Sequence, residues 1–380
     1  TTLNMGLDFG FFDQRLTITP EFYVNRSNNL LVKSKMPLSS GYEFMYRNIG
    51  STQNTGIDLT INSVNITNKN FRWTSTLTLS HNKNEILSLS GEQSYLETSG
   101  WGYKQSDYLV AVGQSIGLMY GFKTIGLYQT DDFVTEDDGT GNMVFKMDGG
   151  KYVLKEGVTS RANVDVKPGY WKFADTDDAN KGVIDDNDRQ VIGNATPIFH
   201  GGFNNTFVYK NFDLSLFMNF SYGNDILNAT KLFTSLYGWS NKNTLSLNDA
   251  SQRWVTVGSD GQPLITPEAM NSVNNGKVVA QWNDMENGDQ VIHSWGVEDG
   301  SFLRLANITF GYTLPQNISK KIFAENLRLY ASANNLYTLT KYTGFDPEVS
   351  TRNSTGTTPG VDWGAYPRST SFVFGLSITF

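Results

Sequence analysis

Thr370-Ser371-Phe372-Val373-Phe374-Gly375-Leu376-Ser377-Ile378-Thr379-Phe380 is the stretch that decides the fold. Its apolar side chains recur at every second residue from Phe372 to Phe380, so they share one face of an extended strand. The other face carries small or polar residues, and no residue is charged. The segment has about 11 residues, and a tilted strand needs roughly 9–11 to cross a bilayer. The pattern is therefore typical of a transmembrane β-strand.

The composition excludes several classes of protein. The 380 residues include no cysteine, which rules out disulfides, zinc–thiolate sites and thiol nucleophiles within this sequence. No run of 18 or more apolar residues is present, so a transmembrane helix is not expected. The net charge of -7 and the lack of a basic aromatic patch argue against nucleic acid as a partner.

The same alternation recurs along the chain. Further strand-like segments begin near residues 3, 16, 57, 71, 199, 212, 306 and 327, which gives about nine strands in all. Short turns alternate with long connections at 27–49, 85–195, 225–299 and 340–369. Short periplasmic turns and long extracellular loops are the rule for membrane barrels. We therefore predict an all-β fold, a transmembrane antiparallel β-barrel, and assign the strand-like Gly117–Gln129 to extracellular structure.

Charged residues avoid the apolar face of the predicted strands, as expected where a cation at the bilayer midplane costs roughly 2–4 kcal/mol. The residues on the opposite face are Asp8, Glu21, Asp58, Arg72, Asp213 and Arg328. Arg304 is an exception, because it shares the phase of Ala306 and Ile308. Either it lies at the loop end of its strand, or a bulge shifts the phase. Four aromatic residues are interpreted as an interfacial girdle: Trp73, Tyr209, Tyr222 and Tyr312.

Six stretches in fixed order resemble one family. They are 182–197 (GVIDDNDRQVIGNATP), 297–305 (VEDGSFLRL), 307–315 (NITFGYTLP), 333–336 (ANNL), 342–348 (YTGFDPE) and 366–368 (YPR). In this order and spacing they resemble the C-terminal half of SusC/RagA-type TonB-dependent outer-membrane transporters of Bacteroidetes. The resemblance covers nearly the whole chain.

The resemblance implies an N-terminal plug inside a barrel of about 22 strands. Residues 1–380 would then be an incomplete segment, roughly strands 14–22, with the plug, the TonB box and the first barrel strands absent. It also implies location in the cell outer membrane, with outer-membrane lipid around the barrel. The expected function is TonB-coupled import of glycans or peptides, with a SusD-like surface lipoprotein over the mouth and TonB acting through the missing part. The alternatives are a non-transporting barrel scaffold in a surface assembly and a soluble β-sandwich carbohydrate-binding module.

Enzyme chemistry is not expected. The three histidines, His81, His200 and His293, lie far apart, and no nucleophile elbow, Walker A loop or His-Glu-x-x-His motif occurs. The acidic run 175–188 resembles a calcium loop in which Asp177, Asp185 and Asp188 would be ligands. Ala179 and Lys181 occupy two of the ligand positions, so the ligand count favours acids that cap turns, with a calcium site as the alternative.

A further set of aromatic residues and the C-terminal Phe380 are candidates for function. Aromatic rings of the extracellular connections could stack on sugars or contact a partner, although loop packing accounts for most of them: Trp101, Tyr103, Tyr170, Trp171, Tyr237, Trp239, Trp282 and Trp295. Phe380 ends an amphipathic strand and resembles the signal that the outer-membrane insertion machinery reads. The alternative for Phe380 is an interfacial anchor.

Overall fold

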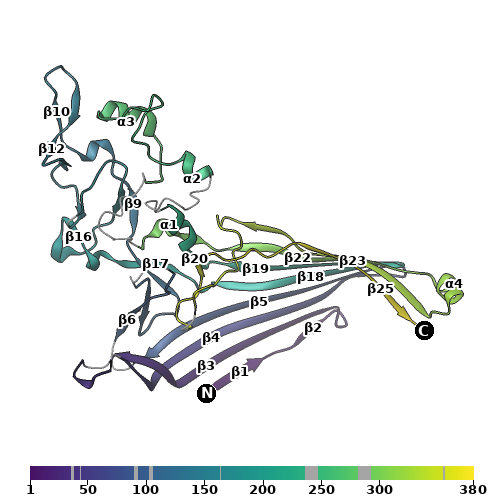
Figure 1. Ribbon diagram of the computed structural model, residues 1–380. Helices are drawn as coiled ribbons and strands as arrows, with labels where there is room; N and C mark the ends of the chain where they lie inside the picture. Colours follow the sequence, from purple (N-terminus) through teal and green to yellow (C-terminus); the bar gives the residue numbers. More distant parts are fainter. Residues whose placement is uncertain are drawn as a thin grey trace.

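The computed structural model describes residues 1–380 apart from 36–37, 43, 90–92, 102–105, 163, 236–246, 281–291 and 354–355. A large twisted antiparallel sheet forms one region, and loops, small sheets and helices gather at one end of it (Figure 1). We call the first region the barrel sheet. The second, made of residues 89–198, 223–300 and 341–370, is called the cap.

The barrel sheet has nine strand positions, as the alternation predicted. Its order is β1-β3-β4-β5-β18-β19-β22-β23-β25, and β2 continues β1 along β3. The strands are β1 (Thr2–Gly6), β2 (Phe9–Phe11), β3 (Leu16–Lys35), β4 (Phe44–Thr67), β5 (Phe71–Ser88), β18 (Phe199–Tyr209), β19 (Phe212–Tyr222), β22 (Phe302–Thr313), β23 (Asn326–Thr340) and β25 (Ser371–Thr379). Because β5 pairs directly with β18, the segment between them contributes no strand to this sheet. Gly117–Gln129 lies in the cap and outside the barrel sheet, and its extracellular position stays a prediction.

The predicted long connection at 27–49 is wrong. Strands β3 and β4 stay paired as far as Lys35 opposite Phe44, which leaves only residues 36–43 between them. The alternation of apolar residues fades beyond the membrane, whereas the ladder hydrogen bonds continue, because they belong to the backbone and need no apolar face. These two strands have 20 and 24 residues, so their outer halves project well past the length that a bilayer requires.

The exception at Arg304 is explained by a bulge. The register of β22 shifts between Leu305 and Asn307 against both neighbouring strands. Arg304 is therefore opposite Asn219, on the polar face, while Leu305 is opposite Met218, on the apolar face. Of the two explanations offered by the sequence, the shift of phase is confirmed.

The two faces of the barrel sheet differ as the sequence predicts. Apolar side chains of one face remain exposed, for example Phe374 at 80% and Leu376 at 57%. The opposite face is polar and carries the ion pair between Arg328 and Asp213, whose nearest atoms are 2.6 Å apart. The other sheets have two to four strands and belong to the cap. None of the described sheets therefore covers the apolar face as the second layer of a β-sandwich would.

Polar groups interrupt the apolar face near Asn205. Asn205 shares that face with Leu216, its cross-strand partner, and is only 6% exposed. Its Oδ1 accepts hydrogen bonds from Trp73 Nε1 at 3.0 Å and from Ser75 Oγ at 2.7 Å. The Trp73 ring stacks on Phe207, with ring centroids 5.5 Å apart. Hydrogen bonding reduces the cost of this buried amide, and the indole shields it.

The cap is built from short elements. A four-stranded sheet contains β6 (Ser94–Glu97), β7 (Tyr108–Ala111), β8 (Leu118–Gly121) and β17 (Gln190–Asn194). A three-stranded sheet contains β20 (Asp225–Asn228), β21 (Val297–Asp299) and β24 (Val361–Asp362). Paired short strands are β9 (Thr124–Leu127) with β15 (Trp171–Phe173), β10 (Thr135–Asp137) with β11 (Met143–Phe145), β12 (Met147–Asp148) with β13 (Lys151–Tyr152), and β14 (Ser160–Arg161) with β16 (Val183–Ile184).

Three helices belong to the cap: α1 (Ala229–Ser235), α2 (Leu247–Ser251) and α3 (Pro267–Asn274). A fourth, α4 (Gln316–Ser319), lies in the turn between β22 and β23, at the end of the sheet far from the cap (Figure 1). No helix among the described residues has the length and apolar character that crossing a membrane requires. The cap has its own apolar cores, one of which gathers Trp101, Tyr108, Met119, Leu227, Ala229, Leu232, Ile292 and Val361.

Candidate functional site

A ring of four charges joins the cap to the polar face of the barrel sheet. Arg304 of β22 is 2.6 Å from Asp346 and 3.1 Å from Glu348, measured from guanidinium nitrogen to carboxylate oxygen. Arg368 lies 2.9 Å from Glu348. Burial raises the pKa of Asp346, but hydrogen bonds from Arg304 and the Glu348 backbone outweigh it and hold that pKa below its ordinary value. The connection 341–370 is thereby tied inward, toward the lumen.

A second junction, inside the cap, centres on Glu298 of β21. Its carboxylate accepts hydrogen bonds from Lys231 at 3.0 Å, from Asn228 at 3.2 Å and from the Thr343 backbone N–H at 2.8 Å. Several stretches that carried the family resemblance thus meet at these two junctions. The Arg304 ring joins the cap to the sheet and the Glu298 contacts join parts of the cap to one another, so these stretches of the resemblance supply structural contacts.

The aromatic candidates divide into buried and half-buried rings. Trp101 is 2% exposed and donates from Nε1 to Asp107, and Tyr170 is 8% exposed. Trp171 and Trp295 are half-buried and lie together, with ring centroids 5.2 Å apart. The remaining four, Tyr103, Tyr237, Trp239 and Trp282, lie outside the described residues. Contact with a substrate or partner stays a prediction, and Trp171 with Trp295 is the pair best placed for it.

The imidazole of His293 packs against this pair. Its ring centroid is 5.2 Å from that of Trp171 and 6.2 Å from that of Trp295. Burial, helped by nearby Lys231, lowers the pKa of His293 to about 3. The ring is therefore neutral near pH 7, and it serves packing.

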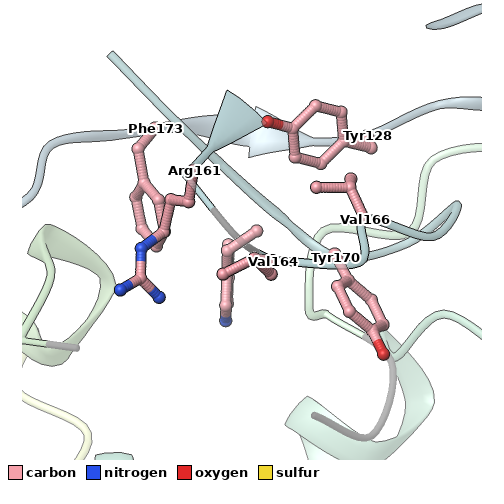
Figure 2. A pocket seen from close by; sticks show the side chains of 7 residues that line it. Tyr128, Arg161, Val164, Val166, Tyr170 and Phe173 are labelled. Carbon is pink, nitrogen blue, oxygen red and sulfur yellow. The ribbon is translucent and has the colours of Figure 1, made fainter. Parts of the chain in front are cut away.

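A small pocket in the cap lies beside the same aromatic residues (Figure 2). It is lined by Tyr128, Arg161, Val164, Val166, Tyr170, Trp171 and Phe173. Its volume of about 40 Å³ holds a few water molecules and is too small for a sugar ring. The Tyr128 hydroxyl donates to the Thr159 carbonyl at 2.6 Å. Burial raises the pKa of that hydroxyl, so it remains a donor near neutral pH.

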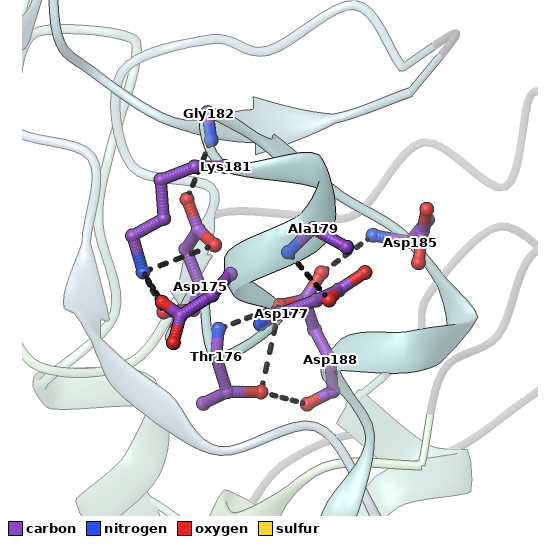
Figure 3. Close-up of polar contacts among 9 residues, drawn as sticks. Asp175, Thr176, Asp177, Ala179, Lys181, Gly182, Asp185 and Asp188 are labelled. Atoms are coloured by element: carbon purple, nitrogen blue, oxygen red, sulfur yellow. Dashed lines mark hydrogen bonds and ion pairs between the residues drawn. The ribbon is translucent and has the colours of Figure 1, made fainter.

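The acidic loop uses its carboxylates to cap turns (Figure 3). Asp177 accepts from the Ala179 N–H at 2.9 Å, and Asp185 accepts from the Asn187 N–H at 2.8 Å. Asp188, which is fully buried, accepts from three backbone N–H groups, those of residues 176, 177 and 185. Burial raises the pKa of Asp188, and these hydrogen bonds outweigh it, so its pKa lies below the ordinary value.

The predicted calcium ligands are thus brought together by their hydrogen bonds to the backbone, which is the interpretation that the ligand count favoured. Lys181 lies 3.5 Å from Asp175, inside the same loop. Across the part of the chain that the structure describes, no group of three or more His, Cys, Asp or Glu side chains is arranged to hold a metal ion.

The lumen face carries a feature that the sequence analysis missed. Three aromatic rings lie over glycines of a neighbouring strand: Tyr23 over Gly56, Phe217 over Gly202, and Tyr330 over Gly375. A Cβ at Gly375 would come within 2.1 Å of the Tyr330 ring. For Tyr23 and Tyr330 the available signal was an aromatic residue in the polar phase of a strand, directly opposite a glycine of the next strand. In these pairs the ring occupies space that a side chain at the glycine would otherwise fill.

Phe380 lies at the end of the barrel sheet away from the cap, and its ring is 81% exposed (Figure 1). It follows Thr379, whose carbonyl accepts a hydrogen bond from the Glu325 N–H at 2.7 Å. The position suits both readings of this residue, an interfacial anchor and an assembly signal, and the signal stays a prediction.

The fold and its two faces define a segment of an outer-membrane β-barrel. Comparison with known proteins gives the family resemblance its support. The chain is 33% identical over 384 residues to TonB-dependent receptor P3 of Formosa agariphila, covering 100% of this chain and 34% of that protein. It is 28% identical over 391 residues to TonB-dependent receptor SusC of Bacteroides thetaiotaomicron, covering 100% and 32%. The chain therefore spans about a third of the length of these curated relatives. No family model matches the sequence.

Solved structures agree on the fold. The structure of the RagAB peptide transporter superposes with a TM-score of 0.69 at 22% identity, over 100% of this chain and 35% of that one. The RagAB peptide importer in its 'closed-closed' state gives a TM-score of 0.66 at 23% identity, over 100% and 35%. The predicted resemblance to SusC/RagA-type TonB-dependent transporters is confirmed along the whole chain, and with it the outer membrane as the location.

Proposed function

We propose that this chain supplies the C-terminal barrel strands and part of the extracellular surface of a TonB-coupled importer of glycans or peptides. Residues 1–380 would form roughly strands 14–22 of the barrel, and other parts of the protein would supply the plug and the remaining strands. The observation that carries the proposal is the barrel sheet, whose apolar face is outward and whose polar face lines a lumen. Similarity over the full chain to TonB-dependent receptors supports it.

In this proposal, energised TonB withdraws the plug and opens the lumen to the cargo. The polar wall lets a hydrated cargo pass, because it offers hydrogen-bonding groups throughout. The cap would meet the cargo and a SusD-like lipoprotein at the cell surface. The ion pairs of Arg304 support this arrangement, since they connect the cap to the wall.

The proposal needs no catalytic chemistry. The curated relatives are named as receptors, and the three histidines of this chain lie in separate elements, β5, β18 and the segment before β21. The protein would therefore bind and move its cargo unchanged. A non-transporting scaffold remains the competing function, because a scaffold could use the same barrel and cap.

Uptake by intact cells separates the importer from the scaffold. We expect deletion of the full-length gene to abolish entry of either fluorescent oligosaccharides or fluorescent oligopeptides, and a TonB-deficient strain to show the same loss. Complementation with the full-length gene should restore uptake in the TonB-positive strain alone. Unchanged uptake of both cargo classes in the deletion strain would favour the scaffold.

A further inference from the structure

A recess opens in the lumen wall where β4, β5, β18 and β19 meet. Its volume is about 340 Å³, and it is lined by Asp58, Leu59, Thr60, Thr78, Leu79, Ser80, His200, Gly201, Gly202 and Phe217. Gly202 forms part of its floor, because it has no side chain to fill the space between Thr78 and Asn219, its partners on the two neighbouring strands. The recess is thus built into the wall by sequence and register.

The polar groups of the recess come from one row across the sheet. Glu21, Asp58, Ser80 and His200 are successive cross-strand partners, so their side chains point into the lumen side by side. Asp58 accepts a hydrogen bond from the Ser80 hydroxyl. Phe217, which is 40% exposed, forms the opposite wall and lies over Gly202. The recess therefore combines a carboxylate, an imidazole and an aromatic face.

The two carboxylates of this row have no lysine or arginine partner within the described residues. Glu21 and Asp58 are directly opposite one another, and none of the described Lys or Arg side chains forms an ion pair with either. Like charges opposite one another in a sheet repel. The Glu21 side chain lies over Gly6, on the side away from Asp58, as this repulsion requires. By contrast, Asp213 on the same face is paired with Arg328 at 2.6 Å.

We propose that the recess binds a cationic side chain, an ammonium or guanidinium group, inside the lumen. The Asp58 carboxylate would pair with the cation, the Glu21 carboxylate would add negative potential, and the Phe217 ring would contribute a cation–π contact. A neutral sugar would leave the charge of this row uncompensated. The inference depends on the proposed function in one respect, because it takes this face of the sheet to be the lumen side of a barrel.

The cation can come from two sources that share this chemistry. One is a basic residue of the plug, which would hold the closed lumen together. The other is a basic residue of a peptide cargo on its way through. The sources differ in when the recess is occupied: a plug residue occupies it in the resting protein, whereas a cargo residue occupies it only when peptide is present.

The charge of the recess can be measured with a single cysteine. This sequence has no cysteine, so Ser80→Cys in the full-length protein, with any cysteine elsewhere replaced by serine, gives one thiol in the recess. Its rates of modification by an ammonium-bearing and a sulfonate-bearing methanethiosulfonate are compared in detergent, with the plug present and with it deleted. In the plugless barrel we expect the cationic reagent to react roughly tenfold faster or more, because a cleft of one sign concentrates the opposite charge. Asp58→Asn with Glu21→Gln should remove most of this preference, whereas Glu268→Gln on α3 should leave it intact.

Protection of the thiol identifies the source of the cation. Slow labelling in the intact protein and fast labelling without the plug would assign the cation to the plug. Fast labelling in the intact protein, slowed by trilysine and unaffected by trialanine, would assign it to peptide cargo. Equal rates for both reagents in the plugless barrel, together with no protection by plug or trilysine, would overturn the proposal. Because this labelling requires no transport, its failure leaves the import proposal untouched, and loss of import leaves the labelling result untouched.

Discussion

The barrel sheet and the cap bury their apolar residues in different ways. Nearly all of the fully buried apolar side chains belong to the cap, among them Tyr108, Met119 and Phe133. The barrel sheet instead leaves large apolar side chains exposed along one face, because lipid covers that face in the membrane. Two regions of one chain are therefore stabilised in different ways. The cap is stabilised by its own cores, whereas the sheet depends on ladder hydrogen bonds and on the membrane.

The largest expected effect concerns the side of the membrane on which each region lies. Labelling of a cysteine in the cap and of one in a turn at the other end of the sheet should differ almost completely. A cysteine introduced at Asn142, in the hairpin of β10 and β11, should react with an impermeant maleimide on intact cells. A cysteine at Lys69, in the turn between β4 and β5, should react only after the outer membrane is permeabilised. Both positions are exposed, so accessibility of the side chain does not separate them. The reverse labelling pattern would invert the assigned orientation.

The second-largest effect is expected from a substitution where the cap joins the barrel sheet. Arg304→Met removes the 2% exposed guanidinium that Asp346 and Glu348 share. Loss of one partner of a buried ion pair costs up to about 5 kcal/mol, because the remaining charges stay buried without it. We expect residues 341–370 to become sensitive to protease and the barrel to lose heat resistance. The matched control is Arg352→Met, a surface arginine of the same connection. Equal protease sensitivity of the two variants would show that the ring does not tie the regions together.

A core substitution should affect the cap alone. Phe133 is fully buried, and its ring contacts those of Tyr128, Phe145 and Tyr152. Phe133→Ala should cost the cap about 3–5 kcal/mol through lost burial and the cavity left behind. Limited proteolysis of the cap should detect this loss, while the heat-modified mobility of the barrel on gels stays unchanged. Val191→Ala, at a position that is 44% exposed, serves as control. Loss of barrel mobility in Phe133→Ala would mean that the two regions fold as one unit.

Within the barrel sheet, the loss of stability caused by an arginine should depend on the face that the substituted residue occupies. Leu216→Arg places a cation toward lipid and should destabilise the barrel by roughly 2–4 kcal/mol, whereas Ser215→Arg points into the lumen and should be tolerated better. Folding titrations in urea with lipid vesicles give both free energies of unfolding. Equal losses would contradict the assignment of the two faces.

The smallest effect is a pH dependence in the cap. The pKa of Asp188 in the folded protein lies below the ordinary carboxyl value of 3.8. Its carboxylate therefore adds stability that is complete above the unfolded value and is lost as the pH falls from there through the lower folded pKa. Asp188→Asn should loosen the 175–188 loop at pH 7 and flatten its acid dependence, measured by protease cleavage between pH 3 and pH 7. Asp178→Asn, at a side chain that is 98% exposed, should leave the profile unchanged.

The sequence predicted the barrel sheet far better than the cap. Alternation with a period of two located every strand of the sheet, since lipid and lumen impose opposite chemistries on alternate residues. The extension of β3 to Lys35 left no such signal, because both faces meet water beyond the membrane. The cap gave little pattern, since its strands have two to five residues and its cores join distant segments.

The contacts of the candidate site residues were also hard to predict, because their partners are distant in sequence. Asp188 could be recognised as part of an acidic loop, but its role as a turn cap depends on three backbone N–H groups placed by the fold. The partners of Arg304 lie 42 and 44 residues away, and only the bulge at Ala306 brings its side chain to their face. Pairing across the sheet brings Asp58 and His200 into one row with Ser80 between them, although they lie more than a hundred residues apart in sequence.

The rings that lie flat over glycines give the wall a low relief. Any other residue at Gly375 would push the Tyr330 ring off the sheet and into the bore, and the same holds for Tyr23 over Gly56. In the proposed importer, cargo passing these positions would meet the rings and no side chain that projects beyond them from the glycines. The glycines opposite these rings would thereby help to set the width of the proposed bore.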